Sequence, residues 1–268
     1  MYEREIRAVR CLDCVPEIPS LRNNADPATS GALAPSSNGS VQRPLSSLEV
    51  SVGVAGGSAR REHERRSDAR QTRIRDAHPH LGSLILALSD DPQSTKAWSV
   101  GAEGEERLGH RLDGLVGESV RVLHDRRIPR TRANIDHIVI STAGIFVIDA
   151  KKYTGRPRLR VDGGLIRPRT ETLMVGTRDR TRLVDGIRGQ IDVVESALPP
   201  TGSAPVPIRG MLCFVDAEWP IFGGDFTIQG VQVLCPKKAA QHIVMPGTLS
   251  TDSVEMIFRS LAAALPPA

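Results

Sequence analysis

Hydrophobic positions in this 268-residue chain lie mostly after residue 98, where helical and strand periodicities alternate. Apolar residues recur three and four positions apart over 101–117 and 181–198, which predicts two amphipathic helices. Shorter apolar runs predict strands, and one further amphipathic stretch predicts a closing helix. The strand candidates are 120–128, 135–141, 144–152, 208–215 and 231–234, and the closing helix is 251–265. Helix, three strands, helix and more strands indicate an α/β fold.

The first part of the chain has a different pattern. Residues 15–58 are rich in Pro, Ser, Ala, Gly and Asn and lack periodicity, so we expect 1–58 to be a disordered extension. Residues 59–76 hold seven arginines and four acids with almost no apolar stripe, which predicts a solvated helix. A basic arm that touches nucleic acid is the alternative. We therefore divide the chain into the extension, a charged helix and linker at 59–98, and a folded domain at 99–264.

Charged residues interrupt the predicted hairpin IDHIVISTAGIFVIDAKKY at residues 135–153. Strand side chains alternate between faces, so Asp149 and Lys151 share one face. With an even loop, Ile140 pairs with Ile145, and Asp136 then falls opposite Asp149. Cross-strand partners have Cβ atoms about 4.5–5.5 Å apart. Two carboxylates this close are unfavourable unless a cation lies between them.

The hairpin allows two other interpretations. Thr142–Ala143 is not a favoured two-residue turn, and Gly144 could start a bulge that shifts the pairing by one residue. The two aspartates could also be exposed at the strand ends and pair with arginines.

Two polar residues lie within apolar helix stripes. Gln190 falls among Leu183, Ile187 and Val194, and Glu105 is in line with Leu108 and its neighbours. A cap or a core hydrogen bond explains either residue taken alone, and a carboxylate is favoured near a helix start. Together with the two aspartates, they point to one polar site.

These residues, in this order, resemble a known family. Gly101-Ala102-Glu103-Gly104-Glu105, Ile135-Asp136-His137, Ile148-Asp149-Ala150-Lys151-Lys152-Tyr153 and the helical Gln190 are similar to the NERD (nuclease-related) domain. That domain belongs to the PD-(D/E)XK nuclease superfamily. Many relatives carry Glu at the position of Asp149, and the superfamily accepts either acid. The resemblance implies a restriction-endonuclease-like core, with a central mixed sheet flanked by helices.

The resemblance also implies a role for each of these residues. Asp136, Asp149 and the backbone carbonyl of Ala150 would hold Mg²⁺ or Mn²⁺, which prefer hard oxygen ligands. Lys151 would orient the attacking water. Glu105 would bind a second metal ion or orient the ligands of the first from behind, and Gln190 would position water or the scissile phosphate. Zn²⁺ is disfavoured because no His/Cys cluster joins these carboxylates.

The charge distribution fits a polyanionic partner. The net charge is +4, and residues 156–188 hold nine arginines against four acids. Arg156, Arg158 and Arg160 begin this segment, so we expect them to contact nucleic acid phosphates. An arginine-rich solvated surface is the alternative. Only nine aromatic residues are present, which gives little support to a base-stacking platform.

Other classes of protein find no support. The longest apolar run, 81–88, is far shorter than the roughly 18 residues of a membrane span. The first ten residues show no signal peptide, and one C-x-x-C at Cys11 and Cys14 indicates neither a zinc ribbon nor a disulfide framework. We expect a cytoplasmic protein with no membrane association.

Two hypotheses follow. The first is a Mg²⁺-dependent nuclease of low sequence specificity that acts on DNA ahead of RNA. The second is a nucleic-acid-binding or regulatory module that keeps the nuclease scaffold with little or no turnover.

Overall fold

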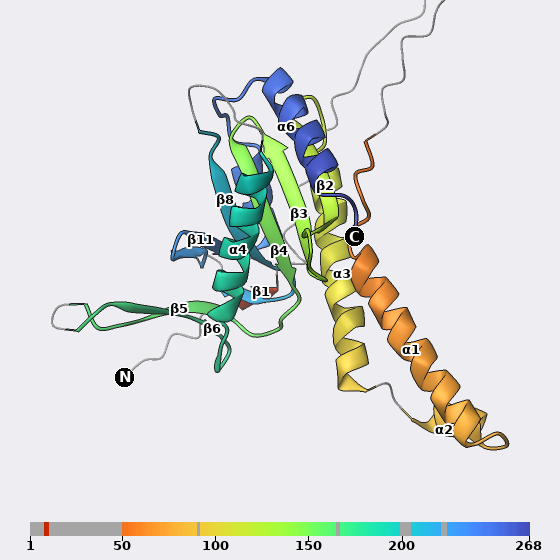
Figure 1. Ribbon diagram of the computed structural model, residues 1–268. Coiled ribbons are helices and arrows are strands. Elements are labelled where there is room, and N and C mark those ends of the chain that lie inside the picture. The colour runs from red at the N-terminus through yellow and green to blue at the C-terminus, as the bar shows by residue number, and fades with distance from the viewer. Residues whose placement is uncertain (1–7, 11–49, 90–91, 165–166, 199–204, 221–223) are drawn as a thin grey trace, which may run out of the picture.

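A computed structural model describes residues 8–10, 50–89, 92–164, 167–198, 205–220 and 224–268 (Figure 1). Its helices are α1 Gly57–Ala77, α2 Gly82–Leu88, α3 Gln93–Asp113, α4 Arg182–Ala197, α5 Pro236–Ile243 and α6 Thr251–Ala264. Its longer strands are β2 Val120–Arg127, β3 Asn134–Ser141, β4 Gly144–Lys151, β5 Pro157–Asp162, β6 Thr170–Val175, β8 Ile208–Phe214 and β11 Val231–Leu234. Its short strands are β1 Ala8–Arg10, β7 Arg178–Asp179, β9 Glu218–Pro220 and β10 Phe226–Ile228.

A six-stranded sheet in the order β10-β11-β8-β4-β3-β2 forms the centre of the molecule. The β4–β8 and β8–β11 pairs are parallel, whereas β2, β3 and β4 pair antiparallel, so the sheet is mixed. Side chains of one face pack with α4 and α6, and those of the other face pack with α3 and α5. The predicted α/β class, with a mixed sheet flanked by helices, is confirmed.

The β3–β4 hairpin has the predicted even register. Ile140 pairs with Ile145 and Ile138 with Val147, across the two-residue turn Thr142–Ala143. Gly144 has a φ of 126°, a value that residues with a Cβ rarely adopt, so glycine closes this turn without a bulge. All four isoleucine and valine side chains of these pairs are fully buried. A shift of one residue would move one strand's side chains to the other face of the sheet.

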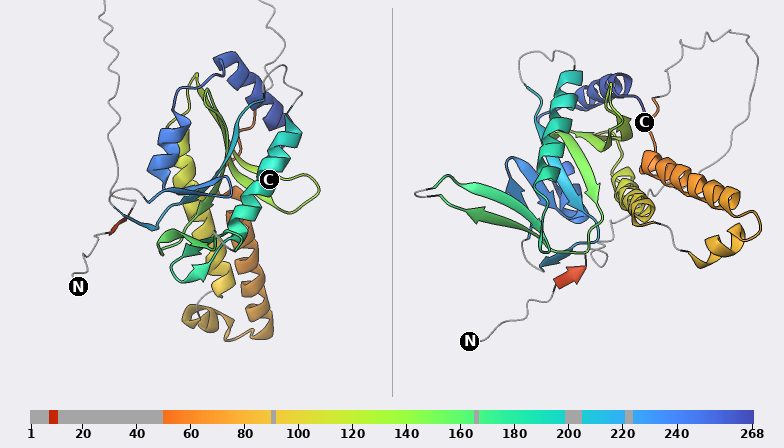
Figure 2. Two further views of the ribbon diagram at one scale, coloured as in Figure 1. Left: turned by 90° about the vertical axis from the view of Figure 1, so that its left-hand side faces the viewer. Right: turned by 60° about the horizontal axis from the view of Figure 1, so that its bottom comes forward.

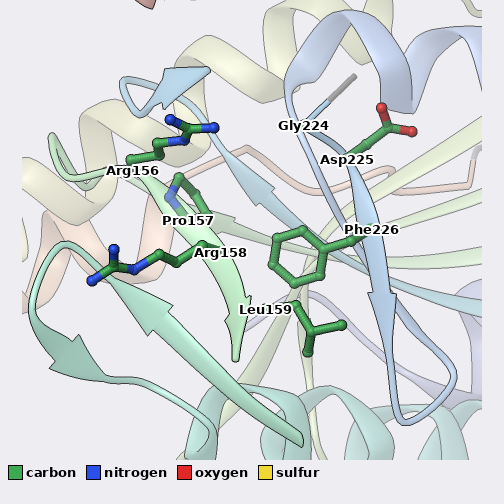
Figure 3. Close-up of a pocket in the computed structure, with 7 residues that line it drawn as sticks. All are labelled: Arg156, Pro157, Arg158, Leu159, Gly224, Asp225 and Phe226. Carbon is green, nitrogen blue, oxygen red and sulfur yellow. The ribbon is translucent and has the colours of Figure 1, made fainter. Parts of the chain in front are cut away.

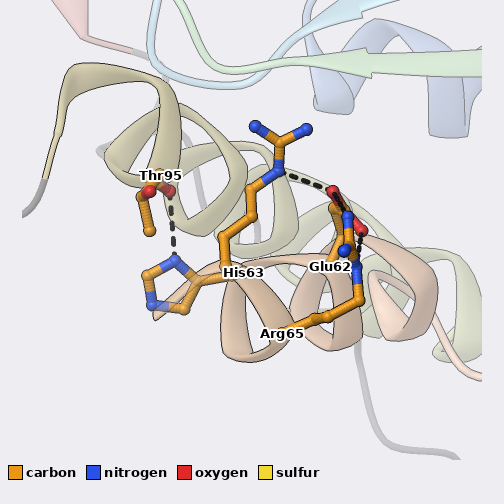
Figure 4. Close-up of polar contacts among 5 residues, drawn as sticks. Glu62, His63, Arg65 and Thr95 are labelled. Atoms are coloured by element: carbon orange, nitrogen blue, oxygen red, sulfur yellow. Dashed lines mark hydrogen bonds and ion pairs between the residues drawn. The ribbon is translucent and has the colours of Figure 1, made fainter. Parts of the chain in front are cut away.

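Helix α3 differs from its prediction at both ends. It begins at Gln93, eight residues before the predicted start at 101, and it ends at Asp113. Its first two turns extend past the sheet and lie against α1 (Figures 1 and 2). Apolar periodicity missed these turns because their contacts are polar, such as His63 Nδ1 to the Thr95 carbonyl oxygen at 3.0 Å (Figure 4). Beyond the helix end, Val116 is 52% exposed, so the predicted amphipathic helix over 101–117 extends too far.

Helices α1 and α2, with the first turns of α3, project from one side of the sheet, and we call this projection the arm. Strands β5, β6 and β7 form a separate three-stranded sheet, the wing, which projects on the other side (Figures 1 and 2). The predicted solvated helix at 59–76 is confirmed as α1, in which only Ala59 is buried. Helix α3 runs unbroken through residues 98 and 99, where the sequence predicts a boundary, and that boundary stays a prediction.

The segment just before α1 lies along β2. The amide of His124 donates to the Val52 carbonyl oxygen at 2.7 Å, and Arg126 donates to the Ser51 carbonyl oxygen at 2.8 Å. Most of the predicted extension, including Cys11 and Cys14, lies outside the described residues. Within the described part, none of the helices is long and apolar enough to cross a membrane.

Candidate active site at the end of β3 and β4

The start of β3 and the end of β4 lie at the same edge of the sheet because the two strands are antiparallel. Their ladder ends with the pair His137–Ile148. Beyond it, the amide of Ala150 donates to Asp136 Oδ2 at 3.0 Å. The Asp136 carboxylate is therefore held against the β4 backbone, one residue from Asp149.

Asp136 and Asp149 are 9% and 7% exposed, and both stand on the face that packs with α4. Burial raises the pKa of Asp136 well above its ordinary value, and the charges of Asp149 and Glu105 raise it further. A carboxyl group in this position binds a proton readily unless a cation balances the cluster.

Lys151 supplies one positive charge. Its Nζ contacts Asp149 Oδ1. Burial alone would lower the pKa of Lys151, but the neighbouring carboxylates of Asp149 and Asp136 outweigh burial and raise it. Lys151 is therefore a fixed ammonium group at neutral pH. It keeps a positive charge beside the two aspartates.

Glu105 reaches the same place from α3. Burial raises its pKa to about 7, Lys151 opposes this, and Asp125 and Asp149 add to it. Its Oε2 atom is buried and has no hydrogen-bond partner within the described part of the chain. Gly104 explains how the helix comes so near. A Cβ there would lie 3.0 Å from the Cβ of Lys152, so glycine permits the close approach of α3 to the end of β4.

Gln190 lies on the side of α4 that faces the sheet, between the buried residues Ile187 and Val194. Its Oε1 atom is also buried, with no hydrogen-bond partner among the residues that the structure describes. No hydrogen bond among the described residues joins it to Asp136 or Asp149. The structure thus brings Asp136, Asp149, Lys151 and Glu105 together and leaves the role of Gln190 a prediction.

His137 lies on the opposite face from the aspartates. Its Nδ1 is 2.8 Å from His124 Nδ1, and His124 Nε2 is 2.9 Å from Asp113 Oδ1. Burial, and then His124, lower the pKa of His137 well below its ordinary value. His137 is thus a neutral, packed side chain away from the cluster.

The predicted phosphate-contacting arginines lie at the base of the wing and along β5. Arg156 and Arg158 line a pocket of about 490 Å³ with Phe226 and Asp225 (Figure 3). Arg158 donates to the Gly176 carbonyl oxygen at 3.0 Å, and Arg160 pairs with Asp162 at 3.0 Å. Arg156 is exposed and has no ion pair with any described residue.

The sequence prediction gave no individual role to Arg180, although it lies in the same basic segment. The Arg180 guanidinium stacks 5.2 Å from the ring centroid of Tyr153, two residues beyond Lys151. A cation close to the end of β4 could not be found from sequence spacing, because 27 positions separate the two residues.

The oxygen donors fit a hard divalent cation. Two buried carboxylates, the Ala150 carbonyl and the unpartnered Glu105 Oε2 supply oxygen only, as Mg²⁺ and Mn²⁺ prefer. Among the described residues, no three His, Cys, Asp or Glu side chains are already grouped as a metal cage. Mg²⁺ does not require one, since it commonly uses one or two carboxylates together with water and substrate phosphate.

Comparison with models of known protein families gives a match over the site. Residues 100–215 match the family model described as the nuclease-related domain, NERD. The matched segment contains every predicted site residue, from Glu105 to Gln190. Neither the curated proteins nor the solved structures include a match to the chain.

Proposed function

We propose that the protein is a metal-dependent nuclease that hydrolyses phosphodiester bonds with little sequence specificity, because residues 100–215 match the family model of the nuclease-related domain. The observation that carries the proposal is the convergence of Asp136, Asp149, Lys151 and Glu105 at one edge of the sheet. Burying three carboxyl groups together costs stability, so their position requires a reason other than folding.

Hydrolysis of a phosphodiester requires a water molecule to attack phosphorus, while the bond to the leaving oxygen breaks and that oxygen takes up a proton. Asp136, Asp149 and the Ala150 carbonyl would hold Mg²⁺ or Mn²⁺, with Glu105 as a further ligand. The ion would lower the pKa of bound water and stabilise charge on the phosphate oxygens. The Lys151 ammonium would orient the attacking water and favour its deprotonated form, and Gln190 would position that water or the phosphate.

The substrate is proposed to be nucleic acid, with DNA ahead of RNA. Arg156 and Arg158 would bind phosphates beside the scissile one, because both lie just beyond the end of β4. Contacts of this kind supply affinity that does not depend on sequence and that falls steeply with salt.

One observation favours the second candidate, a binding module without turnover. Lys151 already contacts Asp149, one of the two carboxylates that a metal would need. A site that keeps this ion pair would bind nucleic acid without cutting it.

A cleavage assay separates the two candidates. Purified protein is incubated with plasmid, linear duplex, single-stranded DNA and RNA, with Mg²⁺, Mn²⁺ or EDTA. The nuclease proposal expects cleavage with a divalent ion only, lost in Asp149→Asn and kept in Asp192→Asn, which makes the same charge change at an exposed position of α4. Binding without cleavage under any of these ions supports the module. Equal cleavage by wild type and Asp149→Asn places the activity elsewhere.

A further inference from the structure

A second basic surface lies between the arm and the end of β2. Helix α1, Trp98 of α3, Arg127 of β2 and the β2–β3 loop line a groove of about 630 Å³. We call it the arm groove. Five of its lining residues are arginines, and Glu62 is its one carboxylate side chain. These arginines are Arg61, Arg65, Arg66, Arg127 and Arg132.

The arginines of the groove are not equally available. Glu62 accepts from Arg65 at 2.7 Å and from Arg66 at 2.5 Å, so one carboxylate serves two guanidinium groups (Figure 4). Arg127 and Arg132 are exposed, and within the described chain neither side chain has an ion pair or a hydrogen bond. Two uncompensated cations in one groove attract an anionic ligand.

An aromatic side chain completes the groove wall. Trp98 is 39% exposed, and the Arg66 guanidinium lies 5.6 Å from the centroid of its ring. An exposed aromatic ring can pack against sugars and bases, and an arginine beside it can bind phosphates. Trp219, the other tryptophan of the chain, is buried in the core, so Trp98 alone reports on this surface.

The groove adjoins the edge of the sheet that carries Asp136 and Asp149, which we call the catalytic edge. Asn134 lines it and lies two residues before Asp136 in β3. Ser58, on the other wall, and Asn134 both donate to the buried carboxylate of Asp125, at 2.7 and 2.6 Å. This shared acceptor fixes the first turn of α1 to the starting end of β3, and its charge contributes to the raised pKa of Glu105. The arm and the wing lie on opposite sides of the end of β4 (Figure 1), and the groove lies on the arm side.

We propose that the arm groove binds the sugar–phosphate backbone of the nucleic acid substrate, on the side of the catalytic edge away from the wing. The identity of the ligand rests on the proposed nuclease function. Arg127 and Arg132 contact phosphates, and Trp98 packs against the strand. Nucleic acid is favoured over an acidic protein because guanidinium groups spread along a groove match evenly spaced phosphates.

Binding in EDTA tests this proposal without cleavage. A labelled duplex of about 30 base pairs is titrated across a salt series with wild type, Arg127→Ala/Arg132→Ala and the control Arg73→Ala/Arg75→Ala. The control removes the same charge from exposed positions of α1 outside the groove. The groove variant should bind about tenfold more weakly, with a salt slope lower by about two, and the control should change less than about twofold.

Tryptophan fluorescence gives an independent measurement. Duplex binding should quench the emission of wild type and of the Arg73/Arg75 control, and Trp98→Phe should abolish the quenching. Thermal melting of each variant verifies folding.

Three results would overturn the proposal: unchanged affinity and slope in the groove variant, an equal loss in the control, or competition by poly-glutamate as strong as that by unlabelled duplex. These results do not depend on cleavage. A protein that never cuts but binds through Arg127 and Arg132 would refute the nuclease and retain the groove. A protein that cuts and binds nucleic acid normally without these arginines would support the nuclease proposal and refute binding in the arm groove.

Discussion

The amide of Ala150 donates a 3.0 Å hydrogen bond to Asp136 Oδ2, at the point where the β3–β4 ladder has ended. The Asp136 carboxylate thus takes the place of the next backbone carbonyl of β3 as the hydrogen-bond acceptor. The bond keeps the Asp136 carboxylate beside Asp149 and Lys151, and the carbonyl of the same Ala150 is the further metal ligand that we propose.

Opposite charges at the cluster should give opposite effects on binding. In EDTA, Lys151→Ala removes a cation beside the proposed phosphate position and should weaken duplex binding about threefold to tenfold. Asp149→Asn removes an anion there, so binding should hold steady or strengthen. Fluorescence anisotropy measures both affinities, and Asp192→Asn is the charge control. Weaker binding in Asp149→Asn than in Lys151→Ala would contradict this placement of the phosphate.

The wing arginines should contribute unequally. Arg156→Ala and Arg158→Ala should each lower duplex affinity several-fold and reduce the salt slope by about one. Arg160→Ala should have a smaller effect, because its guanidinium is shared with Asp162 at 3.0 Å. The measurement is the logarithm of the affinity against the logarithm of salt concentration. Equal slopes for all three variants and wild type would remove the wing from the binding surface.

Glu105 should make metal-free stability depend on pH. The folded state raises its pKa from 4.5 to about 7, mainly by burial, so the folded protein holds a proton that the unfolded chain loses. The free energy of unfolding therefore falls as pH rises from about 4.5 to 7, and the loss persists above that range. Relative to Glu105→Gln, wild type should lose about 1–3 kcal/mol of unfolding free energy between pH 5 and 7.5.

Urea denaturation in EDTA at several pH values measures this difference. Glu103→Gln is the control on the same helix. Contact with Lys152 lowers the pKa of Glu103, so the stability from that group is lost only at lower pH. Parallel curves for wild type and Glu105→Gln would show that Glu105 ionises normally in the folded protein.

Arg126 should be a major source of stability. Its fully buried guanidinium donates to the carbonyl oxygens of Leu265 at 2.6 Å, Ala262 at 2.8 Å and Ser51 at 2.8 Å. Burial lowers its pKa to about 10, so it stays charged at neutral pH. Arg126→Lys leaves some of these carbonyl oxygens without a donor. It should lower the free energy of unfolding, measured by urea denaturation, by about 3 kcal/mol. The exposed neighbour change Arg127→Lys should stay within about 0.5 kcal/mol, and a similar loss in both would refute this role.

The sequence by itself determined the hairpin and the order of the site residues. The two-residue period of a strand is a local property, so alternation alone placed Asp149 and Lys151 on one face with Val147, and Asp136 on one face with Ile138. Apolar residues cover both faces of β3 and β4, so the two-residue turn closed by Gly144, and not the burial of one face, sets the register.

The tertiary structure decided what depends on residues distant in the chain. Helix α3 begins at Gln93 because α1 packs against its first turns through polar contacts, which leave no apolar period to detect. The arm groove joins Arg61 to Arg127 and Arg132 only because Asp125 anchors Ser58 and Asn134, 76 positions apart, to one carboxylate. Burial of Glu105 likewise arises from the approach of α3 to β4. Hydrophobic patterning specifies which face of a helix or strand is buried. Which charged residues meet at the edge of the sheet depends on how those helices and strands pack against one another.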